Sequence, residues 1–298
     1  MIDDNSKEFI KRHIGPSAED QLKMLKHVGY NTLDDLMVNT VPEKILLKDE
    51  LKINEPLSEN DALKKLKSIS KKNRIFRNFI GMGYYNSITP NVILRNILEN
   101  PGWYTSYTPY QPEVAQGRLE MLLNFQQSII DLTGMDIANA SLLDEATATA
   151  EAVGLSQRLD KTNSKKIFIS NNCNPQTIDL IKTRTNPFGL ELIIGDENKV
   201  LSEIKEDIIC GVLSYPGTLG EIIDPSESIS QIHKKNGKAI LVCDLLALAK
   251  LKTPAELGAD IAVGSAQRFG IPMGYGGPHA AFFATKEEFK RSMPGRII

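Results

Sequence analysis

The second half of the sequence alternates short, almost continuously apolar runs with polar segments of helical spacing. The apolar runs are KIFIS (166–170), LELIIG (190–195), IICGVLSYP (208–216), AILVCD (239–244), ADIAVGS (259–265) and HAAFFAT (279–285). Strands that are apolar throughout and separated by helices are typical of a parallel sheet with helices on its faces. The pattern therefore predicts an α/β fold with a mostly parallel sheet.

Polar residues follow these runs at the end where such a sheet binds ligands, beyond the carboxyl ends of its strands. Asp244 could bind the protonated ring nitrogen of pyridoxal phosphate or cap the turn DLLALAK that follows it. Arg268 could bind an anion or form a structural ion pair. The residues alone leave these alternatives open. Candidate site residues at this edge are Ser170, Asn171, residues 215–217, Asp244, Gln267 and Arg268.

The first part of the chain has another texture. Short helical segments such as SAEDQLKMLKHVG and SENDALKKLKSI predict a helical amino-terminal arm over residues 1–75, ahead of a large α/β domain over residues 76–298. Residues 78–116 are rich in Gly, Pro and Tyr and read mostly as loops. The run GRLEMLLNFQQSIIDLTG (117–134) has a 3.6-residue apolar stripe and predicts a long helix that stops at Gly134.

Composition excludes several classes of function. The three cysteines, at 173, 210 and 243, have no CxxC spacing, and the four histidines form no metal-binding pair, so we expect neither disulfides nor a metal site. A net charge of −2 does not indicate the basic surface that binding to nucleic acid requires. The apolar runs are too short to cross a bilayer, and the start MIDDNSKEF lacks the apolar core of a signal peptide. These observations predict a cytoplasmic protein.

Three long stretches carry a family resemblance. They are residues 79–126 (FIGMGYYNSITP through GRLEMLLNFQ), residues 131–152 (DLTGMDIANASLLDEATATAEA) and residues 263–285 (VGSAQRFGIPMGYGGPHAAFFAT). Together they resemble the amino-terminal half of glycine decarboxylase, the P-protein of the glycine cleavage system. The resemblance implies the large domain of a fold type I pyridoxal-phosphate-dependent transferase. It also implies a smaller carboxyl-terminal domain after MPGRII (293–298), which predicts that this chain is a fragment.

The resemblance also implies a degenerate cofactor pocket. The catalytic half of this family has His-Lys-Thr-Phe before a similar glycine-rich turn (here Gly274, Gly276 and Gly277), and its lysine binds the cofactor. Aligned on Phe269, that lysine position is Gln267, and an amide cannot form an imine. Asn171 stands where the family has a histidine that stacks on the cofactor. Asp144 and Glu145 stand at a helix start that would otherwise bind phosphate.

What remains is a relic pocket of Asn171, Asp244, Gln267 and Arg268, without a catalytic residue. The resemblance then implies the noncatalytic alpha subunit of a glycine dehydrogenase (decarboxylating), which decarboxylates glycine and transfers the aminomethyl group to the lipoyl arm of H-protein. Its partner would be the catalytic beta subunit or a fused carboxyl-terminal half, which would bind most of the pyridoxal phosphate. We expect this chain to supply the second wall of the pocket or an interface, through Tyr84, Tyr85, Tyr104, Tyr107, Tyr110 and Gln111.

Two alternatives remain open from the sequence. The chain could be a stand-alone lyase or transferase that uses a displaced lysine such as Lys250 or Lys252. It could also be a silent interaction subunit that stabilises a partner without shaping the site.

Overall fold

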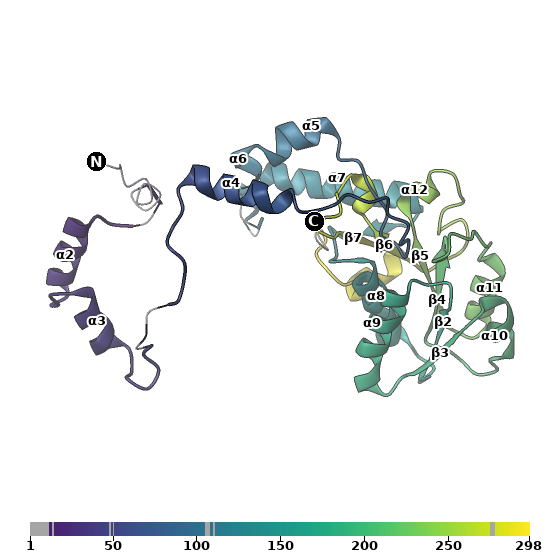
Figure 1. Cartoon of the computed structure of the whole chain (residues 1–298). Coiled ribbons are helices and arrows are strands. Elements are labelled where there is room, and N and C mark those ends of the chain that lie inside the picture. The colour runs from purple at the N-terminus through teal and green to yellow at the C-terminus, as the bar shows by residue number, and fades with distance from the viewer. Residues whose placement is uncertain are drawn as a thin grey trace. The chain divides into compact units, whose positions relative to one another are not determined.

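The computed structural model describes residues 12–13, 15–47, 49, 51–104, 108–109, 111–274 and 278–298. The chain divides into two compact units, Met1–Arg77 and Asn78–Ile298 (Figure 1). Each unit is described by itself below.

The described part of the first unit holds three longer helices, α2 (Ala18–His27), α3 (Leu33–Thr40) and α4 (Glu59–Ser70). Each begins at a hydroxyl side chain, Ser17, Thr32 or Ser58, that accepts a hydrogen bond from a backbone N–H in the first turn. Among the residues of these three helices only Leu25 is buried. Capping thus defines where the helices begin, while their apolar faces contribute little to an internal core.

The second unit is built on a sheet of seven strands in the order β1-β7-β6-β5-β4-β2-β3. Strands β2 to β6 pair in parallel, whereas β7 is antiparallel to both of its neighbours, β6 and β1. The strands are β1 (Ile137–Ala138), β2 (Lys166–Ser170), β3 (Glu191–Gly195), β4 (Cys210–Tyr215), β5 (Lys238–Cys243), β6 (Ile261–Ser265) and β7 (Ala281–Thr285).

Helices cover both faces of this sheet, with α8 and α9 on one side and α10 and α11 on the other (Figure 1). Alternate residues of each strand enter two separate cores, as the period of two in a strand requires. Phe168 belongs to the same core as Ile232 of α11, while Ile169 belongs to the same core as Leu155 of α8. The longer helices are α7 (Gln116–Thr133), α8 (Glu145–Leu159), α9 (Pro175–Thr185), α10 (Glu197–Glu203) and α11 (Ser226–Lys234).

Short helical segments complete the unit. They are α5 (Asn91–Ile93), the π-helix η2 (Leu94–Leu98), α6 (Pro101–Tyr104), α12 (Leu245–Leu248) and the 3-10 helices η3 (Pro112–Val114), η4 (Asn186–Phe188), η5 (Gln267–Phe269) and η6 (Glu287–Ser292). The long helix predicted over 117–134 is α7. It ends at Gly134, as predicted, because φ is +69° there and the N–H of Gly134 bonds to the carbonyl of Ile130.

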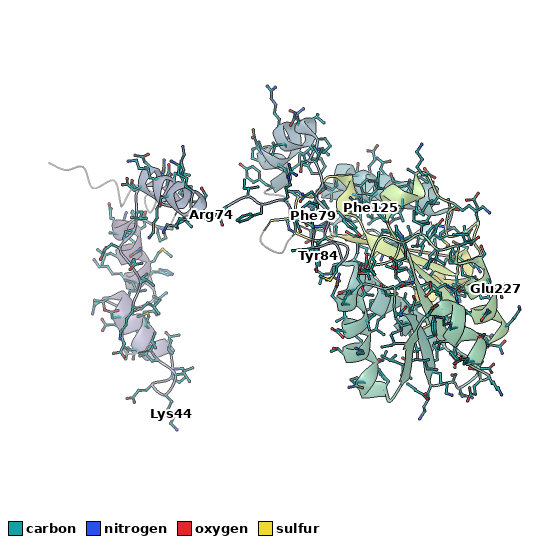
Figure 2. All side chains as sticks on the ribbon, turned by 45° about the vertical axis from the view of Figure 1, so that its right-hand side comes forward. Lys44, Arg74, Phe79, Tyr84, Phe125 and Glu227 are labelled. Atoms are coloured by element: carbon teal, nitrogen blue, oxygen red, sulfur yellow. The ribbon has the colours of Figure 1, made fainter. Side chains whose placement is uncertain are left out.

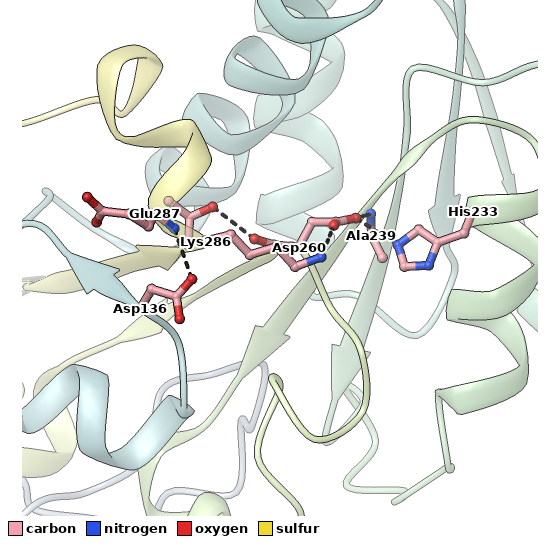
Figure 3. Close-up of polar contacts among 7 residues, drawn as sticks. Asp136, His233, Ala239, Asp260, Lys286 and Glu287 are labelled. Carbon is pink, nitrogen blue, oxygen red and sulfur yellow. Dashed lines mark hydrogen bonds and ion pairs between the residues drawn. The ribbon is translucent and has the colours of Figure 1, made fainter.

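A buried carboxylate, that of Asp260, lies directly before β6 and binds several neighbouring groups. Asp260 Oδ1 lies 2.6 Å from Lys286 Nζ, and Oδ2 lies 2.8 Å both from His233 Nε2 and from the backbone nitrogen of Ala239 (Figure 3). Burial disfavours the charge on Asp260, but the hydrogen bonds with His233, Lys286 and Ala239 outweigh it. They lower the pKa of Asp260 from 3.8 to about 2.

Asp260→Asn is therefore expected to destabilise the fold. Because the pKa of Asp260 is lower in the folded state than in the unfolded state, its carboxylate stabilises the fold at pH values above about 4. This stabilisation is lost as the pH falls from about 4 towards 2. The shift corresponds to about 2 kcal/mol at neutral pH. Urea unfolding from pH 7 to pH 3 measures it, and the variant should show a flatter pH dependence below pH 4.

The matched control is Asp179→Asn, because Asp179 pairs with Lys182 at 3.1 Å but its side chain is 73% exposed. The control should change the unfolding free energy by less than about 0.5 kcal/mol. Equal stability of Asp260→Asn and the control at pH 7 would show that the buried network contributes nothing.

Two further properties concern function. In the described part of the chain, the helices lack the combination of length and apolarity that a membrane crossing requires. The described residues also contain no group of three or more His, Cys, Asp or Glu side chains arranged to hold a metal ion.

Candidate functional site

The candidate site lies at the carboxyl ends of β5 and β6. Asp244 directly follows β5, and Gln267 and Arg268 lie in η5, one residue beyond β6. Because β5 and β6 are parallel neighbours, the residues that leave them meet at the same edge of the sheet. α7 contacts this edge through Phe125, whose ring packs edge to face on Phe269 with 6.0 Å between centroids.

Asp244 is fully engaged by neighbouring groups. Its Oδ1 accepts a hydrogen bond from the backbone nitrogen of Leu246 at 3.0 Å, which caps α12. Arg268 donates from Nε to Oδ1 at 3.0 Å and from Nη2 to Oδ2 at 2.8 Å. Both side chains are mostly buried, with 23% of Arg268 and 20% of Asp244 exposed. This is a two-pronged ion pair of the geometry that guanidinium and carboxylate favour.

Asp244 binds the edge of the Arg268 guanidinium, and a face of the same group contacts an aromatic ring. The guanidinium carbon lies 4.5 Å from the centroid of the Tyr85 ring, a cation–π arrangement. Tyr85 belongs to a segment far from Arg268 in sequence. One arginine therefore contacts both the sheet edge and a distant loop.

Gln267 is buried and directed into the protein. Its Nε2 donates to the carbonyl of Pro278 at 3.1 Å, and its backbone nitrogen donates to Ser265 Oγ at 3.2 Å. Its side chain is neutral and its amide is held by the backbone of the segment before β7. It has no chemistry to offer as a nucleophile or a base.

The amino-terminal end of α8 brings two carboxylates to the same place. Asp144 caps the helix by accepting a hydrogen bond from the backbone nitrogen of Thr147 at 2.7 Å. Glu145 Oε1 accepts from Asn174 Nδ2 at 2.8 Å and from Thr177 Oγ1 at 3.3 Å. Burial raises the pKa of Glu145, its two hydrogen bonds oppose that shift, and the nearby charges of Asp244 and Asp144 add to it.

A loop that we call the strap, residues 81–89, lies against this edge. Among the described residues, three hydrogen bonds hold it to other parts of the second unit. Gln176 Nε2 donates to Met82 O at 2.6 Å, Ser87 Oγ to Ile271 O at 2.5 Å and Thr89 Oγ1 to Gly270 O at 2.6 Å. Tyr84, labelled in Figure 2, packs edge to face on His279 with 5.8 Å between ring centroids.

Two small cavities remain between the strap and the sheet edge, each of about 30 Å³. Such a volume holds a water molecule or two, whereas cofactor pockets are about tenfold larger. The first is lined by Gly83, Tyr84, Asp144, Glu145, Ala146, Gln176, Ser265, Gln267 and His279. The second is lined by Gly83, Tyr85, Glu145, Cys243, Asp244, Ser265, Gln267 and Arg268.

The structure brings together some of the residues proposed from sequence and not others. Seven of them line the two cavities, and four are exposed and line neither cavity. The seven are Tyr84, Tyr85, Asp144, Glu145, Asp244, Gln267 and Arg268, and the four are Tyr104, Gln111, Asn171 and Gly274. Tyr107, Tyr110, Gly276 and Gly277 lie outside the described residues.

Sequence reasoning missed Gln176 and His279 as parts of this site. Gly83 lies in the tyrosine-rich loop of residues 81–85 that the sequence indicates. A Cβ on Gly83 would lie 2.9 Å from Asn174 Nδ2, and φ is +83° there, so the close approach requires glycine. Gln176 and His279 are ordinary polar residues until the fold places them.

Comparison with known proteins gives a family match. Residues 11–298 match the family described as "Glycine cleavage system P-protein". The chain is 75% identical over 298 residues to a glycine dehydrogenase (decarboxylating) of Pelagibacter ubique and 56% identical over 290 residues to one of a Nostoc species, covering 100% and 97% of this chain. It spans about 30% of the length of these curated relatives, 31% and 29% respectively.

A solved structure agrees. The crystal structure of a glycine decarboxylase (P-protein) of the glycine cleavage system, in inhibitor-bound form, superposes with a TM-score of 0.87 at 34% identity, over 96% of this chain and 65% of that one. The predicted fold type I pyridoxal-phosphate-dependent transferase fold is thereby confirmed. The resemblance carried by the three long motifs is also confirmed, and the chain belongs to the glycine cleavage system P-protein family.

Proposed function

We propose that this chain is the noncatalytic part, the alpha subunit or amino-terminal half, of a glycine dehydrogenase (decarboxylating). The curated relatives carry that name, but the chain spans only about 30% of their length. The proposed whole enzyme decarboxylates glycine and transfers the aminomethyl group to the lipoyl arm of H-protein. We place it in the cytoplasm, as the sequence predicts.

The observation that carries the proposal is that the sheet edge of this chain does not fit pyridoxal phosphate. Gln267 offers no amine for covalent attachment. Asp244, which would face a ring nitrogen, already accepts four hydrogen bonds from Arg268 and Leu246. Asp144 and Glu145 place two carboxyl groups where a phosphate would need free N–H donors. We infer that the cofactor is bound mainly by the partner and not covalently by this chain.

The role left to this chain is to shape a shared pocket. Pyridoxal phosphate on the partner supplies the electron sink for decarboxylation. Tyr84 and Tyr85, each more than a third exposed, would present polar-tipped rings towards the partner. Tyr104 and Gln111 are exposed as well and suit an interface more than a cavity wall.

Covalent labelling tests this function. The purified chain is incubated with pyridoxal phosphate, reduced with borohydride and analysed by mass spectrometry. We expect no stoichiometric, site-specific lysine adduct. A single saturable adduct on Lys250 or Lys252 would instead support a stand-alone enzyme, although both lysines are exposed and line neither cavity. The positive control is the partner chain or carboxyl-terminal half, which should be labelled at one lysine.

A second experiment separates a pocket wall from a silent interaction subunit. Tyr84→Ala is introduced, and both assembly with the partner and glycine turnover are measured. A pocket wall requires a lower kcat/KM in an enzyme that still assembles. A change in assembly with unchanged turnover of the assembled fraction would support the silent subunit.

A further inference from the structure

We infer that Arg268 is a positioning residue that fills the cofactor-ring position of the fold and holds the strap against the sheet edge. What the strap faces rests on the proposed function, but the contacts that hold it do not. The inference combines three sets of contacts, those at Asp244, at Tyr85 and along the strap.

The first set shows that Arg268 replaces a ligand at Asp244. In pyridoxal-phosphate enzymes an acidic residue receives the protonated ring nitrogen, which is a planar cation. Here the planar guanidinium donates to both carboxylate oxygens, at 3.0 and 2.8 Å. A mostly buried carboxylate without a partner would be costly, and this pair removes that cost without any bound molecule.

The second set shows that the same guanidinium contacts the strap. Its carbon lies 4.5 Å from the Tyr85 ring centroid, and 183 residues separate the two in sequence. A guanidinium that is already paired keeps its faces free for a ring. Arg268 therefore transmits the position of β5, through Asp244, to the loop that carries Tyr84 and Tyr85.

The third set shows that the strap depends on few other contacts. In the described residues, its other side-chain hydrogen bonds and ring contacts with the rest of the second unit are the hydrogen bonds at Met82, Ser87 and Thr89 and the packing of Tyr84 on His279. Large apolar side chains beside it and within it are exposed, with Phe79 at 88% and Ile88 at 91%. Little buried apolar surface holds the strap, so loss of the Arg268 contact should loosen its centre.

Hydrogen exchange of the full 298-residue chain tests the inference. Arg268→Ala is expected to speed backbone exchange in residues 81–89 by about tenfold. This is the size of effect expected when a partly desolvated cation–π contact is lost. Tyr85→Leu removes the ring but leaves the Asp244 pair intact, and it should give a similar increase. Arg268→Lys should restore part of the protection, because lysine keeps the charge but not the planar two-pronged geometry.

A matched control and a coupling measurement separate positioning from general destabilisation. Arg184→Ala removes another arginine–carboxylate pair, with Glu151 at 2.5 Å, whose arginine is 53% exposed, and it should leave strap exchange unchanged. In the double variant Arg268→Ala/Tyr85→Leu, the strap should exchange no faster than in Arg268→Ala, because the two substitutions remove the same contact.

Three results would overturn the inference: strap exchange within about twofold of wild type in Tyr85→Leu, additive effects in the double variant, or an equal increase throughout residues 78–298. If Arg268→Ala does not fold, Tyr85→Leu alone decides. None of these results depends on cofactor labelling. A labelled lysine would therefore refute the proposed function and leave standing the inference that Arg268 holds the strap, and the reverse also holds.

Discussion

Gly264→Ala is expected to lower the free energy of unfolding by about 3 kcal/mol, because the new methyl group has no space. Gly264 lies in β6, where a Cβ would be 2.1 Å from the carbonyl oxygen of Cys243 and 2.8 Å from the Phe282 ring. The first neighbour is backbone of the adjacent strand, which cannot move without breaking the parallel pairing of β5 with β6. The Phe282 ring is itself fully buried, so it has nowhere to turn.

Urea or thermal unfolding measures this effect, with Gly154→Ala as the control. Gly154 lies within α8, and its nearest neighbour would be Arg158 Nη1 at 3.5 Å, an ordinary contact. The control should be as stable as wild type or more stable by up to about 1 kcal/mol, since alanine favours helix. Equal stability of Gly264→Ala and wild type would mean that β5 and β6 are spaced more loosely than described.

Gly270→Ala is the second large effect, and it acts on the strap. The backbone of Gly270 has φ of +114°, and a Cβ would lie 2.8 Å from Pro90 Cδ and 3.0 Å from the carbonyl oxygen of Ile88. Strain and overlap together should cost about 3 kcal/mol. The variant can escape this cost only by moving residues 88–90 away, which would break the hydrogen bond from Thr89 to Gly270 O.

Unfolding and hydrogen exchange of residues 87–92 together report this change. Gly189→Ala is the control, because φ is +63° there but nothing lies within 4 Å of the added methyl group. The control should lose about 1 kcal/mol from backbone conformation alone, with no change in exchange at 87–92. Unchanged exchange at 87–92 in Gly270→Ala would show that Gly270 does not hold the strap.

The sequence predicted most of the fold because the six apolar runs are long and regular. It did not show that HAAFFAT pairs antiparallel, since apolar runs alone do not encode strand direction. A signal was available in the connection. A parallel crossover usually needs a helix, and the segment between Ser265 and Ala281 contains only the short η5 in its described part. The glycines and prolines there already argued against a long helix.

The site was predictable where one rule links sequence to place. Asp244, Gln267 and Arg268 follow strand ends, and the carboxyl-edge rule brought them together. Asn171 follows a strand end as well but is exposed, because position in the chain does not set side-chain direction. The contact of Tyr85 with Arg268 could not be predicted, since it joins a loop to a strand end 183 residues away. No local pattern records such a pair.

The pairing of β1 with β7 has a consequence for synthesis on the ribosome. Ile137 emerges 148 residues before its partner Thr285, and β7 separates β1 from β6 in the finished sheet. Before β7 is available, the open edge of β6 has unpaired backbone groups, and side chains that are buried in the complete fold, such as Ile261 and Val263, lie next to it. A nascent chain that has left the ribosome only as far as residues 265–281 should therefore recruit chaperones more strongly than one that has left it beyond residue 290.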